Sequence, residues 1–137
     1  MATYNKFNAF VEHVAEGVHN LQTGALTVAL TAAANAPVAT NTVLADLTQI
    51  AYTNLSARVI TVSSSSQTSG TYSLVPADLV LTASGAVATF RYVVIYNDTP
   101  TAPADPLICW YDHGSDVTLA NGETYTIDFG SSLFTLV

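Results

Sequence analysis

The chain has 137 residues and a formal net charge of −7, from 10 acidic and 3 basic side chains. Half of its residues are apolar, whereas only 9% are charged, against about 25% in an average soluble domain. Three basic residues cannot neutralise many phosphates, so we expect no binding to nucleic acid or to a membrane surface. One cysteine precludes an internal disulfide and a cysteine-rich metal site, and we expect no cofactor. The length is typical of a single domain over residues 1–137.

The low charge content also bears on the surface of the folded chain. A free monomer usually keeps its surface charged, whereas the centres of protein interfaces are poor in charge. We therefore expect neighbouring copies or partner proteins to cover much of this surface. A Ser/Thr-rich β surface that needs little charge is the alternative.

Residues 4–21 have the apolar spacing of an amphipathic helix, and we place an N-terminal helix within residues 1–22. Its apolar stripe either packs on the rest of the chain or docks on another subunit. Glu12, Glu16 and His19 lie on the opposite face and could hold a divalent metal, but a solvated helix face has the same composition, so we predict no metal site. The stripe is formed by Phe7, Phe10, Val11, Val14, Val18 and Leu21.

The segment after this helix imitates an export signal. An apolar run over residues 25–30 precedes several small residues, but the stretch before it is too long and carries Glu12 and Glu16 where a signal would be basic. The run is also too short to span a bilayer. We expect a chain that is made and kept in a cytoplasm, or assembled there.

From residue 24 the apolar period changes from that of a helix to that of strands. A short helical turn is expected over residues 44–50, and residues 63–70 read as a strand end with a mobile turn. The fold class that follows is mainly β, a single β-sandwich or small barrel of about seven or eight antiparallel strands in residues 24–137. The expected strands cover residues 26–31, 58–65, 72–75, 79–82, 90–96, 107–111 and 133–137.

Residues 90–96 form the most apolar segment, and both of its faces look covered. This is typical of a central strand or of one at an assembly contact. Alternation predicts that Val93 and Ile95 face one way, and that the other face is formed by Phe90, Tyr92, Val94 and Tyr96.

The last hairpin has two possible registers. Asn121 and Gly122 resemble a two-residue turn, but that register points the flanking apolar residues to opposite faces. A three-residue loop over 120–122 pairs Val117 with Tyr125 and gives Gly122 a left-handed conformation. Because a one-residue slip inverts every side chain, we predict the bulged register.

No constellation of residues points to catalysis. Residues 111–116 contain Asp112, His113 and Ser115, but neighbours in one turn do not meet the geometry of a catalytic triad. Cys109 lies in an apolar strand and is expected to be a core residue. The sequence therefore predicts a protein that is not an enzyme.

Two further clusters could bind ligands. Asp112, Asp116 and Asp128 could gather Ca²⁺, but the spaced loop of a specific calcium site is missing. An aromatic set could form a platform for sugar stacking, although aromatic residues are more often core and interface. This set consists of Tyr92, Tyr96, Trp110, Tyr111 and Tyr125.

Arg58 and Arg91 lie in expected strands of a chain with few cations. Either could pair with Asp112 or Asp128, within one subunit or across an interface, and such a pair would set register rather than stability. Together with part of the helix stripe they complete the candidate interface, which consists of Phe7, Phe10, Val14, Val18, Arg58 and Arg91.

Five motifs along the chain stand out: MATYNKFNAFVE from Met1, GVHNL from Gly17, FRYVVIYNDT from Phe90, PLICWYD from Pro106 and NGETYTIDF from Asn121. They resemble motifs of small virion structural proteins of tailed bacteriophages, and the similarity extends over nearly the whole chain. The resemblance implies a virion component and transfers no site residues.

We therefore expect a capsid decoration (cement) protein that binds the outer shell in many copies, with the major capsid protein or other virion proteins as partners. Localisation in the virion and a homo-oligomer, such as a trimer, are expected with this role. An acidic domain would also be repelled by the packaged genome. A tail, neck or fibre-associated module and a carbohydrate-binding module are the alternatives.

Overall fold

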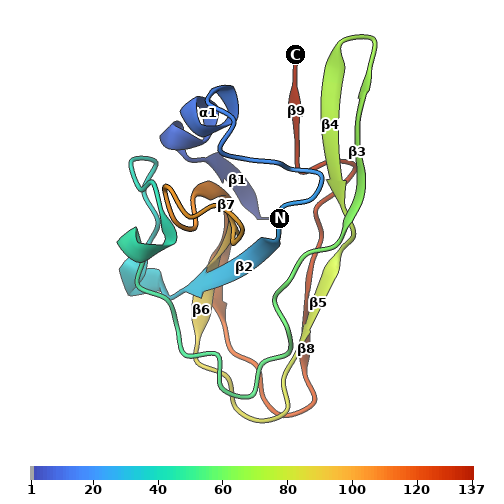
Figure 1. Cartoon of the computed structure of the whole chain (residues 1–137). Helices are drawn as coiled ribbons and strands as arrows, with labels where there is room; N and C mark the ends of the chain where they lie inside the picture. Colours follow the sequence, from blue (N-terminus) through green and yellow to red (C-terminus); the bar gives the residue numbers. More distant parts are fainter. Residues whose placement is uncertain (1) are drawn as a thin grey trace.

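A computed structural model describes residues 2–137, and the chain is mainly β, with 44% strand and 10% helix (Figure 1). These residues form nine strands, one α-helix and two 3-10 turns, which confirms the predicted fold class. The elements in chain order are β1 Thr3–Lys6, α1 Asn8–Ala15, β2 Leu26–Thr31, η1 Ala33–Asn35, η2 Leu44–Asp46, β3 Val62–Thr68, β4 Thr71–Pro76, β5 Leu79–Thr82, β6 Phe90–Asn97, β7 Leu107–Val117, β8 Thr124–Ile127 and β9 Phe134–Leu136.

The strands form two layers of antiparallel sheet. One layer is a four-stranded sheet with the order β1-β7-β6-β2. The other consists of the three-stranded sheet β3-β4-β9 and the two-stranded sheet β5-β8, which follow one another along the same side of the molecule (Figure 1). The main core lies between the layers and takes side chains such as Leu30 and Val93 from one and Leu74, Leu81 and Ile127 from the other. The arrangement is that of a small β-sandwich.

Strand β6 lies inside its sheet, as its apolar sequence predicted. Val93 and Ile95 pack into the main core, whereas Val94 and Tyr96 pack into a second apolar cluster on the opposite face of the sheet. Phe7, which precedes α1, and side chains of the loop that contains η2 cover this second face. Both faces of β6 are therefore buried within the chain itself.

The predicted orientation of Phe90 is wrong. Phe90 belongs to the main core with Val93 and Ile95, and not to the face of Val94. The pairing of β6 with β7 shifts between Phe90 and Tyr92, so the strict alternation that we assumed is broken there.

The helix is shorter than the predicted span of residues 4–21. Residues 3–6 form β1, which pairs with β7 from Cys109 to Asp112. The open edge of β7 offers backbone hydrogen bonds that local helical periodicity cannot reveal, so tertiary pairing overrides it. The helix ends at Ala15, and Gly17, two residues further on, has a φ of +74°. The amides of Gly17 and Val18 donate to the carbonyls of Val14 and His13, the bonding pattern of a glycine C-cap.

The predicted pairing of the last hairpin is also wrong. Strand β8 pairs with β5 and not with β7, because the edge of β5 competes for the same backbone groups. The local turn is nevertheless as expected, since Gly122 has a φ of +84° and the Glu123 amide donates to the Ala120 carbonyl. Val117 and Tyr125 also still pack against one core, although they are not paired.

The Ser-rich segment is more ordered than a strand end with a mobile turn. Residues 62–76 form the β3–β4 hairpin, which reverses at Ser69 and Gly70 with φ values of +50° and +85°. The residues just before it lie against the outer edge of β2, where Val59 bridges Thr27, and the expected strand over 58–65 therefore begins only at Val62. No helix among residues 2–137 is long and apolar enough to cross a membrane.

Candidate interaction surface

The candidate interface residues fall into two groups. Phe7 and Phe10 are 0% and 1% exposed, so they are core residues of this chain and have no surface to offer a partner. Val14 and Val18 are half-buried. Of the predicted stripe, Val14 and Val18 are therefore within partial reach of another protein, together with Val11, whose side chain is 54% exposed. Leu21 is buried in the core.

The two arginines serve different local contacts. The Arg58 guanidinium lies 3.6 Å from the centre of the Tyr52 ring and donates to the Val28 carbonyl. These contacts hold the residues just before β3 against β2. Arg91 on β6 forms a two-pronged ion pair with Asp112 on β7, at 2.9 and 3.3 Å, so one of the predicted pairings is confirmed within the subunit. The Arg91 guanidinium and the Gly114 amide hold the pKa of the Asp112 carboxyl below its ordinary value.

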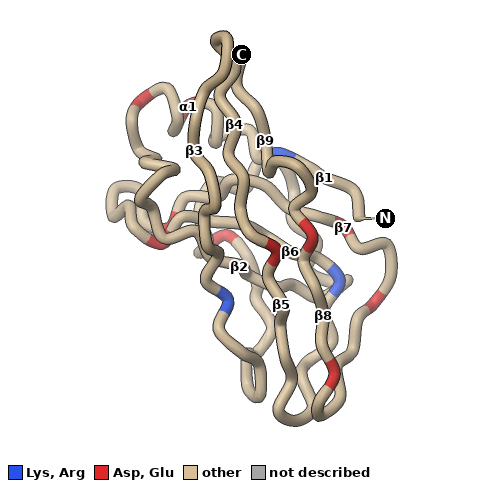
Figure 2. The backbone as a smooth tube through the Cα atoms, turned by 90° about the vertical axis from the view of Figure 1, so that its right-hand side faces the viewer, with Lys and Arg blue, Asp and Glu red and all other residues tan. Residues whose placement is uncertain are grey.

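One end of the molecule has no charged side chain over long stretches. Residues 59–77, which include the β3–β4 hairpin, contain no Asp, Glu, Lys or Arg, and neither do residues 129–137, which include β9. Figure 2 shows this as an uninterrupted tan tube where the hairpin projects beyond the rest of the sandwich, beside β9. We call the β3–β4 hairpin, β9 and the apolar face of α1 the uncharged end; α1 itself carries Glu12, and Lys6 and Glu16 flank the helix.

Exposed apolar side chains gather around β9 at this end. Val11 is 54% exposed, Leu136 is 37% exposed and Val137 is fully exposed. Val11 and Leu136 line the same small groove of about 130 Å³ between α1 and β9. Leu136 also lines a larger hollow of about 460 Å³, together with Tyr72 of β4 and residues of the chain that follows α1. The surface here is largely apolar and hollowed, and Lys6 is the charged side chain among those that line the small groove.

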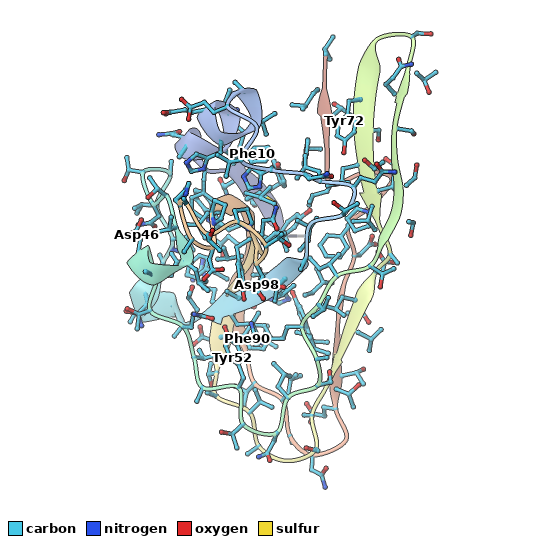
Figure 3. The ribbon with its side chains drawn as sticks, in the orientation of Figure 1. Phe10, Asp46, Tyr52, Tyr72, Phe90 and Asp98 are labelled. Atoms are coloured by element: carbon cyan, nitrogen blue, oxygen red, sulfur yellow. The ribbon has the colours of Figure 1, made fainter. Side chains whose placement is uncertain are left out.

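The side chain of Phe134 supports this end from within. Its ring centre lies 5.1 Å from that of Phe10 on α1 and 6.2 Å from that of Tyr72 on β4. Figure 3 labels Phe10 and Tyr72, which come from the two elements on either side of β9. The short strand β9 thus packs between the helix and the hairpin.

A buried polar cluster fixes the chain that follows α1. The His19 ring packs edge-on against Phe10, and its Nδ1 atom lies 3.2 Å from the amide nitrogen of the fully buried Asn97 at the end of β6. Burial and the neighbouring His13 lower the pKa of His19 to about 4, so its ring is neutral near neutral pH. Gly24 is required beside them, because a Cβ there would lie 2.6 Å from the Asn20 carbonyl oxygen.

The aromatic set that could have formed a sugar platform is divided by the sheet. Tyr96 and Trp110 are buried in the second cluster, with Tyr92 packed against it, whereas Tyr111 and Tyr125 pack on the main core side. A single flat platform of all five rings is therefore excluded. Tyr111 and Tyr125 instead line a pocket of about 440 Å³ between β7 and β8.

Residues 112–116 form a bulged part of β7 instead of a turn. His113 Nδ1 lies 3.4 Å from the Ser115 hydroxyl oxygen, but Asp112 is bonded to Arg91 and to the Gly114 amide. The carboxylate that would orient the imidazole of a triad is thus directed elsewhere. Cys109 is fully buried, as expected, and its burial raises the pKa of the thiol. No group of three or more His, Cys, Asp or Glu side chains in residues 2–137 is placed to hold a metal ion.

Sequence reasoning missed Leu136, Val137 and Tyr72 as surface residues. Their signal was present in the two charge-free stretches, residues 59–77 and 129–137, but the pairing of β4 with β9 was needed to bring those stretches together. Comparison with known proteins adds nothing to this description, since no family model, curated protein or solved structure gives a significant match.

Proposed function

We propose that this chain is a structural protein of a bacteriophage virion, a capsid decoration protein that binds the outer shell in many copies. The observation that carries the proposal is the uncharged end, where exposed apolar side chains surround β9 over two hollows. Burying such a surface against another protein removes apolar area from water and strips few charges of their hydration.

The charge distribution supports the same orientation. The acidic residues that give the chain its net charge of −7 lie outside residues 59–77 and 129–137. A chain that docks through its uncharged end keeps most of its carboxylates in solvent, with Glu12 of α1 at the border of the contact. This favours solubility of the decorated particle and repels the enclosed genome. The sequence resemblance to small virion proteins of tailed phages supports the choice of a phage shell as partner. Closed symmetric clusters, such as trimers, are the form in which we propose that the copies assemble.

The experiment is a binding assay with phage heads that lack this protein. Purified chain is added to such heads, and bound chain is measured after sedimentation. We expect saturable binding that V11D and L136D each weaken at least about tenfold, because each places a charge in a dehydrated interface.

A matched control separates this effect from general damage. Val80 on β5 is 50% exposed, much like Val11, but lies away from the uncharged end, so V80D should bind as the wild type does. Circular dichroism must show that all three variants fold. Binding by V11D and L136D at wild-type strength would refute docking through this end, and no binding of the wild type to the shell would refute the decoration role in favour of a tail or neck position.

A further inference from the structure

The pocket between β7 and β8 exists because these strands do not pair. Strand β7 belongs to the four-stranded sheet and β8 pairs with β5, so the two layers part between them. The resulting pocket of about 440 Å³ is within the range of about 300–1,000 Å³ that is usual for small-molecule sites. It lies apart from the uncharged end, and none of the residues around β9 that line the two hollows there also lines it.

The inner wall of the pocket is apolar and partly aromatic. Val93, Ile127 and Phe129 are buried and form its base, and Tyr111 and Tyr125 stand at its sides. The Tyr111 and Phe129 ring centres are 6.5 Å apart. Such walls suit the C–H faces of a ring-shaped ligand, which pack on aromatic side chains.

The rim of the pocket carries polar groups that can form hydrogen bonds with a ligand. Asp128 accepts from the Gly130 amide through Oδ1 at 2.7 Å, and its Oδ2 atom has no partner among residues 2–137. Tyr111 and Tyr125, which also line the pocket, add two hydroxyl groups. His113 adds an imidazole whose Nδ1 atom is directed to the Ser115 carbonyl at 3.2 Å, which leaves Nε2 for a ligand. Donors and acceptors are thus both offered.

The charges near the pocket select the class of ligand. Among the described residues no Lys or Arg lines it, and the nearby Arg91 is occupied by Asp112, so an anion would meet Asp128 without compensation. A simple cation would use the carboxylate but not the hydroxyl donors. A neutral polyol uses both, since its hydroxyl groups donate to the carboxylate and accept from the tyrosines.

We propose that this pocket binds a neutral hexose at the end of a glycan, with the sugar ring between Tyr111 and Tyr125 and its hydroxyl groups on Asp128. The site is independent of the proposed docking surface. It would give the outward face of the chain an affinity for carbohydrate.

The test is ligand-observed saturation-transfer NMR on the full chain, with glucose, galactose, mannose and N-acetylglucosamine as probes. N-acetylneuraminate serves as the anionic probe and choline as the cationic one. We expect saturation transfer to at least one neutral sugar and to neither charged probe. Amide shifts in the ¹⁵N spectrum should change in residues 111–130 when that sugar is added.

Two charge-matched variants locate the site. D128N keeps an acceptor oxygen for the Gly130 amide but loses the charged acceptor, and we expect it to bind the sugar at least about tenfold more weakly. D116N removes an exposed carboxylate that does not line the pocket and should bind as the wild type does. Silence with all four neutral sugars, equal binding by D128N and the wild type, or a preference for choline or N-acetylneuraminate would each overturn the proposal.

Discussion

Replacing Phe10 with alanine should destabilise the fold strongly, because this side chain joins α1 to the sandwich. Phe10 is 1% exposed and contacts both His19 and Phe134, with ring centres 5.3 and 5.1 Å away. Truncation of a buried Phe to Ala costs about 3–5 kcal/mol, since transfer and cavity contributions add. For a domain of this size, each kcal/mol lowers Tm by about 3–5 °C. We therefore expect F10A to melt about 10–25 °C below the wild type.

The adjacent residue provides the control for this prediction. Val11 is 54% exposed, so V11A should change the free energy of unfolding by no more than about 0.5 kcal/mol. Both variants are measured by calorimetry and by urea unfolding followed by circular dichroism. Equal destabilisation by F10A and V11A, or a larger effect of V11A, would mean that α1 presents a different face to the core, and the docking surface would then have to be redrawn.

Three further outcomes follow from the packing and the charges. The pKa of His19 is about 4 in the folded chain and about 6.5 in the unfolded chain. The wild-type free energy of unfolding should therefore fall as the pH drops from about 6.5 to 4, because the unfolded chain takes up the proton first. Urea midpoints of H19Q should lack this part of the decline. The pKa of Asp112 is lower in the folded chain than its unfolded value of about 3.9, so its ion pair stabilises the fold above that pH, and this stability is lost as the pH falls through the folded value. D112N should therefore lose less of its urea midpoint than the wild type between pH 5 and 3. An unchanged slope would show that the ion pair does not contribute to stability. G24A forces a Cβ to within 2.6 Å of a backbone oxygen and 2.8 Å of the Asn97 amide, and should cost about 1–3 kcal/mol in thermal unfolding, whereas a wild-type Tm would show that this contact relaxes freely.

The parts of the fold that were predictable are those in which local pattern and tertiary environment agree. The segment from Phe90 to Asn97 has apolar residues on both faces, and it is an inner strand with both faces buried. The left-handed Gly122 follows from its place in a short turn. In both cases the physical cause lies within a few residues of the pattern.

The errors arose where a distant strand competed for backbone groups. Residues 4–6 were included in the predicted helix, but they pair, together with Thr3, with the open edge of β7 and form a strand. Likewise, β8 pairs with β5, because hydrogen bonds join Ala83 to Gly122 and Glu123 beyond the strand ends. No local pattern encodes which edge is free, so these pairings could not be predicted from spacing alone.

The candidate surface was half visible in the sequence. The low charge content predicted a covered surface, and the sequence also contains the two stretches without charged residues, 59–77 and 129–137. Their meeting at one end depends on the pairing of Leu74 with Phe134, which joins β4 to β9. The pocket between β7 and β8 was harder to predict from the sequence, because it results from two strands that were expected to pair and do not.

The most direct test of the docking account is a cryo-electron microscopy map of the native virion with the chain fitted into it. We predict density for this sandwich on the outside of the shell, at a copy number comparable with that of the major shell subunit. Val11 and Leu136 should face the shell, and Asp128 should face solvent. Density confined to the tail or neck, or a chain that meets the shell through the β5–β8 side with its uncharged end in solvent, would contradict the account.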